Sequence, residues 1–151
     1  NKFIFFAEET ITRCYFLGED GVERTLWIEP QMSFITEYES FNTQIPSKCN
    51  IHIYQDSSVC HIDRDSLYDL YADYHDWAQV GIAIIEHHFV NLFKLTTTIN
   101  FNDASENYKF IDSSYSHFLD VVPMKHLASW LNISPVHLSR IRKESYKIQS
   151  D

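Results

Sequence analysis

The sequence contains few of the residues that break a chain or cross-link it. Its 151 residues include three glycines, four prolines and three cysteines. Cys14, Cys49 and Cys60 are odd in number and widely spaced, which disfavours a disulfide framework and favours a reducing compartment, namely the cytoplasm. They lie singly in predicted strands, so we expect small buried residues and no iron–sulfur cluster. No apolar run approaches the roughly 20 residues of a membrane span, and no signal peptide begins the chain. Because the first residue is not Met, we expect that an N-terminal piece is missing.

Catalytic and metal-binding motifs are also lacking. We find no Ser/His/Asp arrangement, glycine-rich phosphate loop or closely spaced carboxylate pair, so we expect no enzyme. His87 and His88 follow Glu86, but adjacent residues on a helix point about 100° apart and cannot share one ion. His52 and His61 alone do not supply the clustered ligands of a cupin. The sequence therefore predicts neither a catalytic site nor a metal site.

Positive charge is scarce and unevenly distributed. Twelve Lys and Arg stand against 21 Asp and Glu, a formal charge of −9 that by itself disfavours a nucleic-acid partner. From Val122 onward, however, five cations face two anions, so this tail carries +3 and the remainder −12. The tail's charged residues are Lys125, Arg140, Arg142, Lys143, Lys147, Glu144 and Asp151. An acidic body is thus followed by a basic tail.

Strands dominate the first 60 residues, and helices follow. Residues 15–28 resemble a hairpin with its turn at Gly18 to Gly21, because Asp-Gly supplies the positive φ of a tight turn. Alternation over 49–54 and a second run at 59–62 predict two more strands. Several short, closely spaced strands favour a small roll, barrel or sandwich.

The longest predicted helix covers residues 76–98. Trp77, Val80, Ile84, Ile85, Phe89, Leu92 and Leu95 recur at spacings of three and four. Ile82, Val90 and Phe93 lie off that stripe, so we expect one side to pack on the chain's own strands and the other on a second copy. Asn102 or Asp103 then caps a further helix.

Residues 123–144 contain two short helical patterns joined tightly. The first starts at Pro123 and stops at Asn132, which tolerates a left-handed conformation. Ser134 is an N-cap followed by Pro135, and the second helix packs inward through Leu138 and Ile141. The outward residues of the second helix and its cap suit contact with the major groove of DNA, and we expect seven of them to contact DNA. The set is Ser134, Pro135, Val136, Ser139, Arg140, Arg142 and Lys143. The alternative is an ordinary helical hairpin with a basic surface.

Residues 122–143 resemble the helix-turn-helix of the Crp/Fnr (catabolite-activator) family, particularly its short Bacteroidetes-type members. Residues 22–27, 33–41 and 45–51 are similar to later parts of that family's cyclic-nucleotide-binding β-roll. The long helix that begins at Asp76 resembles the family's dimer helix. The resemblance implies a bacterial α+β protein: an antiparallel β-roll (double-stranded β-helix) over 1–75, N-terminally incomplete, a dimerisation helix over 76–99 and a DNA-binding domain over 100–151. It implies a homodimer bound to double-stranded DNA and leaves RNA polymerase open as a further partner.

The family's nucleotide pocket is degenerate here. Nucleotide-binding members present Gly-Glu-Leu, whose Glu accepts from the ribose hydroxyl, and Arg-Ser-Ala about ten residues later, whose Arg neutralises the phosphate. These fall on Thr36, Glu37 and Tyr38, and on Ser47-Lys48-Cys49, so only Glu37 matches. Losing the Arg contact costs roughly 1.5 to 3 kcal/mol. We expect the strand neighbours of Lys48 to point it away from Glu37. No cofactor is therefore expected, cyclic AMP or GMP is disfavoured, and the effector, if one exists, is unidentified.

The second helix of the helix-turn-helix also departs from the family, because Pro135 and Val136 occupy positions where Arg and Glu are common, whereas Arg140 matches. After Lys147 the chain ends too soon for the β-hairpin wing, so we expect fewer phosphate contacts. The alternative function is a ligand- or protein-binding β-roll whose helix-turn-helix does not engage DNA.

Overall fold

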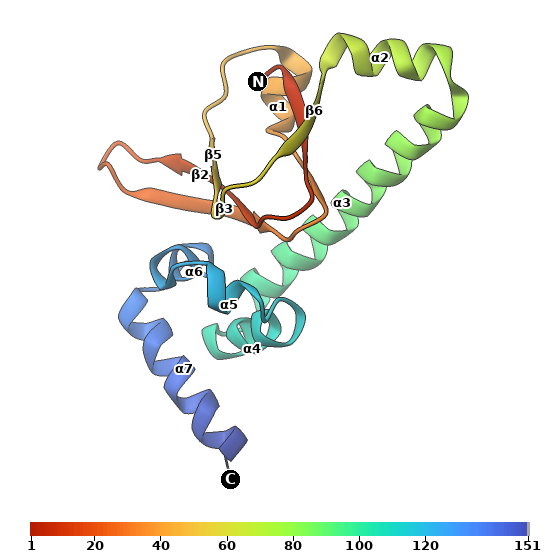
Figure 1. The fold of residues 1–151 in the computed structure, drawn as a ribbon. Helices are drawn as coiled ribbons and strands as arrows, with labels where there is room; N and C mark the ends of the chain where they lie inside the picture. Colours follow the sequence, from red (N-terminus) through yellow and green to blue (C-terminus); the bar gives the residue numbers. More distant parts are fainter. Residues whose placement is uncertain (151) are drawn as a thin grey trace.

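The computed structural model describes the backbone of residues 1–150 and the side chains of residues 1–145. Two three-stranded antiparallel sheets form the N-terminal part (Figure 1). The first has the order β4-β1-β6, from Ser33–Ile35, Phe3–Ala7 and Val59–Asp63. The second has the order β3-β2-β5, from Glu23–Glu29, Thr12–Leu17 and Asn50–Ile53. A short helix, α1 (Tyr38–Thr43), lies between β4 and β5 in the chain. The expected antiparallel α+β fold is confirmed at this level.

The β2–β3 hairpin forms where the sequence predicts it. Gly21 has a φ of +76°, and its amide donates to the Gly18 carbonyl, which closes the turn. Cys14 is buried in β2 and Cys49 is half-buried, but Cys60 is exposed. The expectation that all three cysteines are buried was therefore wrong for Cys60. It lies on β6, an edge strand of its sheet.

Two helices connect the sheets to the C-terminal part. α2 (Arg64–Asp73) begins at the Asp63 cap, and α3 (His75–Phe101) follows after a short break. At 1.5 Å per residue, the 27 residues of α3 extend about 40 Å. The inward side of α3 carries the buried Gly81 and the half-buried Ile84, His88 and Leu95. The predicted long helix is thus present, with each end extended by one to three residues.

Four helices complete the chain: α4 (Ala104–Ser114), α5 (Phe118–Val121), α6 (Met124–Trp130) and α7 (Pro135–Ser150). Asp103, one of the two caps considered, starts α4 through a reciprocal capping box with Glu106. The largest core cluster joins Ile11 and Ile28 of the β3-β2-β5 side to buried residues of α4, α5, α6 and α7. The C-terminal helices therefore pack on this sheet, with α6 against β3 (Figure 1). Among the described residues, no helix is long and apolar enough to cross a membrane.

Candidate nucleic-acid interface and cavity

The connection between α6 and α7 is built as the sequence predicts. Asn132 has a φ of 54°, and the Ile133 amide returns to the Ala128 carbonyl, which ends α6 tightly. Ser134 Oγ accepts a hydrogen bond of 3.2 Å from the His137 amide, and Pro135 is the first residue of α7. A donor-less residue at that position leaves no amide unsatisfied. The turn fixes α7 firmly relative to α6.

Two apolar side chains hold α7 on the body of the protein. Leu138 is 1% exposed and Ile141 is 6% exposed, and both join the cluster that contains Leu127 and Leu131 of α6. Burying each of them contributes about 1.5 to 3 kcal/mol. The side of α7 opposite these residues consequently faces solvent.

The seven residues expected to contact DNA all lie on this helix or its cap. Val136 is 69% exposed, and Ser134, Pro135, Arg140 and Lys143 are also exposed. Ser139 and Arg142 are half-buried. Within the described side chains, Arg140 and Lys143 form no ion pair. The tail residues Lys147 and Asp151 lie outside the described side chains.

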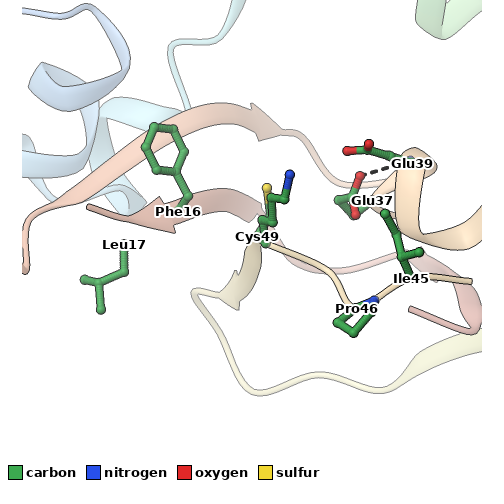
Figure 2. Close-up of a pocket in the computed structure, with 8 residues that line it drawn as sticks. Phe16, Leu17, Glu37, Glu39, Ile45, Pro46 and Cys49 are labelled. Carbon is green, nitrogen blue, oxygen red and sulfur yellow. Dashed lines mark hydrogen bonds between the residues drawn. The ribbon is translucent and has the colours of Figure 1, made fainter. Parts of the chain in front are cut away.

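A cavity of about 380 Å³ lies beside α1 and the β2–β3 hairpin (Figure 2). It is lined by Phe16, Leu17, Glu37, Glu39, Ile45, Pro46, Lys48 and Cys49. Of the five residues expected in a nucleotide pocket, it includes Glu37 and Lys48 but not Thr36, Tyr38 or Ser47. Glu37 and Lys48 both line this cavity, and the expectation that Lys48 points away from Glu37 stays a prediction. Lys48 lies in a bend before β5, which begins at Asn50, so strand alternation does not govern it.

Glu37 has a structural role that its motif position did not reveal. One carboxylate oxygen accepts from the Glu39 amide at 2.9 Å and the other from the Ser40 amide at 3.0 Å, so Glu37 caps α1 (Figure 2). Glu is not a favoured N-cap residue, and the sequence therefore gave only a weak signal for this role. Both carboxylate oxygens of Glu37 are thus engaged. The cavity is lined by two carboxylates, those of Glu37 and Glu39, and by one ammonium group, that of Lys48. It is unfavourable for an anionic ligand.

A buried charged cluster lies between the hairpin and α6. Arg13 is 1% exposed, and its Nη1 donates to Glu23 Oε2 at 2.6 Å while its Nε donates to Thr25 Oγ1 at 2.8 Å. The hydrogen bond from Arg13 is the main reason that the pKa of Glu23 is lowered. His126 of α6 has its Nδ1 2.9 Å from the Tyr54 hydroxyl oxygen. Burial, helped by the positive charge of Arg13, lowers the pKa of His126 to about 4. Periodicity gave no sign that Arg13 points inward.

A second, half-buried titratable group faces the long helix. Glu29 lies at the end of β3, and its Oε1 is 3.9 Å from Nδ1 of His88 on α3. Burial raises the pKa of Glu29 to about 7 and lowers the pKa of His88. Glu29 is therefore substantially protonated near neutral pH, and the two groups meet without a full ion pair.

The outward side of α3 is unusually apolar. Phe89 is 68% exposed and Phe93 is 64% exposed. Six more apolar residues of α3 are exposed, and we call the eight together the α3 apolar face. They are Trp77, Val80, Ile82, Ile85, Phe89, Val90, Leu92 and Phe93. Large amounts of exposed apolar surface mark sites of association.

No protein-family model matches the chain, and no curated protein matches its sequence. The three-dimensional arrangement, in contrast, is similar to solved structures. FixK2 from Bradyrhizobium japonicum superimposes with a TM-score of 0.80 at 15% identity, over 98% of this chain and 76% of that one. The chain has the fold of the Crp/Fnr regulators.

Two further structures carry the same Crp/Fnr fold. A transcriptional regulator of the Crp/Fnr family from Eubacterium rectale has a TM-score of 0.68 at 14% identity, over 98% of this chain and 70% of that one. CLP of Xanthomonas campestris, a c-di-GMP responsive global regulator, has a TM-score of 0.62 at 14% identity, over 99% and 78%. These neighbours are transcriptional regulators, and at such identities the likeness establishes the fold alone.

Proposed function

We propose that this chain is a cytoplasmic, sequence-specific DNA-binding regulator of transcription that acts as a homodimer. Its parts are a β-roll sensor over 1–75, a dimerisation helix over 76–99 and a DNA-binding domain over 100–151, with α6 and α7 as a helix-turn-helix. The observation that carries this proposal is the solvent-facing side of α7. Leu138 and Ile141 hold that helix from behind and leave Val136, Arg140 and Lys143 free to enter a groove.

The side chains of α7 and its cap have distinct tasks on DNA. Arg140 donates two hydrogen bonds to the O6 and N7 edge of a guanine, whereas Val136 lies near the start of the helix and suits contact with a thymine methyl group. Ser134, Arg142 and Lys143 reach phosphates, which set the register without reading sequence. Specificity therefore depends mainly on two residues per protomer.

The second copy covers the α3 apolar face. Burying a Phe or Leu side chain contributes about 1.5 to 3 kcal/mol, so eight such residues per protomer supply ample driving force for a stable dimer. Two α7 helices held by paired α3 helices would read two half-sites about one helical turn apart. RNA polymerase is a further candidate partner of such a dimer on DNA.

Cyclic AMP is not the effector that the cavity favours. Ser47 stands where nucleotide-binding relatives carry the phosphate-binding Arg, and Glu37 caps α1 with both carboxylate oxygens. The cavity is lined by two carboxylates, one Lys and several apolar side chains. These features favour a neutral or cationic ligand, or none.

Quantitative gel shifts test the proposal. Duplexes selected from a random pool by the purified protein would be titrated at roughly 50 and 200 mM salt. Binding that depends on phosphate contacts weakens strongly between these two concentrations. We expect salt-dependent binding and a footprint spanning two half-sites. Absence of binding at the lower salt would favour the rival function, a ligand- or protein-binding β-roll, for which the charge of −9 is the supporting observation.

A further inference from the structure

The β2–β3 hairpin and α6 are joined by a polar connection that neither DNA contact nor dimerisation requires. Thr25 of β3 donates its amide to Ser129 Oγ at 3.0 Å, and Ser129 Oγ donates to the Glu23 carbonyl at 3.3 Å. The Thr25 hydroxyl donates to the His126 carbonyl at 3.2 Å. These three hydrogen bonds link residues about 100 positions apart in the chain. We call Arg13, Glu23, Thr25, His126 and Ser129 the hairpin clasp.

Arg13 organises the hairpin side of the clasp. Its guanidinium fixes the Glu23 carboxylate and the Thr25 hydroxyl at once, so the two acceptors are held at a set spacing on β3. It also lies over the Tyr15 ring, with 4.4 Å between its Cζ and the ring centroid. A buried, paired guanidinium is costly to desolvate, and such groups are retained most clearly where they fix one arrangement over others. Arg13 is therefore suited to positioning α6.

We propose that the hairpin clasp positions the DNA-reading helix: it holds α6, and hence α7, at a fixed angle to α3, so that both α7 helices of a dimer meet their half-sites together. This inference rests on the proposed function. Because Leu138 and Ile141 fasten α7 to α6, any rotation of α6 against β3 carries α7 with it. The exposed side of α7 is free in the clasped state, so the clasped state is the one competent for DNA.

The clasp also shares strands with the cavity. Phe16 and Leu17, which line the cavity, lie on β2 three and four residues beyond Arg13. On the neighbouring strand β5, His52 pairs with Arg13, and the cavity residue Cys49 immediately precedes that strand. A ligand that displaced β2 or β5 would shift the guanidinium that holds Glu23 and Thr25. The hairpin is thus a physical connection from the cavity to α6.

Two substitutions loosen the clasp in different ways. Glu23→Gln removes the charge that pairs with Arg13, and because it leaves a buried guanidinium unpaired it risks misfolding. Ser129→Ala removes both hydrogen bonds of the serine hydroxyl without stranding a charge, and alanine favours the helix. The matched control is Arg24→Gln, which breaks the exposed Arg24–Asp20 pair on the same hairpin without touching α6.

Hydrogen exchange of the intact protein tests the clasp without DNA. We expect faster exchange across Met124–Trp130 in Ser129→Ala and Glu23→Gln, unchanged exchange in β1, β4 and β6, and wild-type exchange throughout in Arg24→Gln. Unchanged exchange in α6 for both clasp variants would overturn the proposal. This result would stand even if the wild-type protein bound no DNA, an outcome that would refute the proposed function separately.

The DNA readout compares a selected duplex with a scrambled duplex of equal length. We expect Ser129→Ala to weaken binding to the selected duplex by about five- to twentyfold, within the range of intramolecular couplings, and to leave scrambled-duplex affinity unchanged. Arg140 and Lys143 keep their charge in this variant, so nonspecific attraction persists. Equal losses on both duplexes would indicate damage to the fold, and an unchanged or increased selected-duplex affinity would show that the clasp does not position α7; either result would overturn the proposal.

Discussion

The stability of this protein between pH 4.5 and 6.5 depends on two groups with opposite effects, the buried His126 and the half-buried Glu29. The pKa of His126 falls from its ordinary 6.5 to about 4, so in that window the unfolded chain binds more protons at this site than the folded one does. Stability from His126 is present above pH 6.5 and is lost as the pH falls towards 4. The pKa of Glu29 rises from 4.5 to about 7, so the folded state binds more protons there. Stability from Glu29 is present below pH 4.5 and is lost as the pH rises towards 7.

The two contributions are similar in size. The pKa changes, from 6.5 to about 4 for His126 and from 4.5 to about 7 for Glu29, each set an upper limit of about 3.5 kcal/mol at roughly 1.4 kcal/mol per pKa unit. Solvent screens both sites, because the Glu29 side chain is 27% exposed and Glu23, 3.7 Å from His126, is 41% exposed. We therefore expect about 1 to 2 kcal/mol from each, and a nearly flat combined contribution in the wild-type protein.

Urea denaturation at fixed protein concentration, at pH 4.5, 5.5 and 6.5, separates the two groups. Glu29→Gln should lose about 1 to 2 kcal/mol more than the wild type on going from pH 6.5 to 4.5, because His126 is then unopposed. His126→Gln should change in the opposite direction. Asp20→Asn, which alters an exposed carboxylate whose pKa is already lowered by Arg24, should parallel the wild type. A Glu29→Gln profile parallel to the wild type would refute the reasoning.

Three further outcomes follow from the same structure. Arg140→Ala should weaken binding to the selected duplex by about ten- to a hundredfold and relax the preference at one base pair, whereas Lys143→Ala should weaken all duplexes alike and reduce the salt slope by about one per protomer, both measured by fluorescence anisotropy. Phe89→Glu should convert the dimer to a monomer in sedimentation experiments, because a charge would be buried in the α3 apolar face. Leu138→Ala should cost about 2 to 5 kcal/mol of unfolding free energy, whereas Val136→Ala, 69% exposed, should leave it within about 0.5 kcal/mol.

Local signals predicted the local structure well. The Asp-Gly turn, the Asp103 cap and the left-handed Asn132 are each determined by a few neighbouring residues, and the structure contains all three. The long helix was predictable for the same reason, because its apolar residues recur at helical spacing from Trp77 to Leu95. In each case the physical cause lies in residues that are close together in the sequence.

Features that depend on distant contacts were not predictable. The hydrogen bond from Thr25 to Ser129 joins positions 104 apart, and no pattern near either residue reports it. The burial of Arg13 likewise depends on α6 covering the hairpin. Cys60 was misplaced because burial was assumed for a residue of β6, which is an edge strand of its sheet. In the cavity, Glu37 matched a family position but serves as a helix cap.

The acidic body and the basic helix together explain how a protein of charge −9 would approach DNA. The described part of α7 carries three cations and one anion, a net charge of +2, while the chain before Val122 carries −12. At physiological salt, charges more than about 8 Å apart are largely screened, so phosphates respond mainly to whichever surface is nearest. Approach by the acidic sheets is repelled, and only approach with α7 leading is attractive. Under the proposed function, affinity that rests on so few cations would be modest for random sequence, and discrimination would come from the groove contacts proposed for Arg140 and Val136.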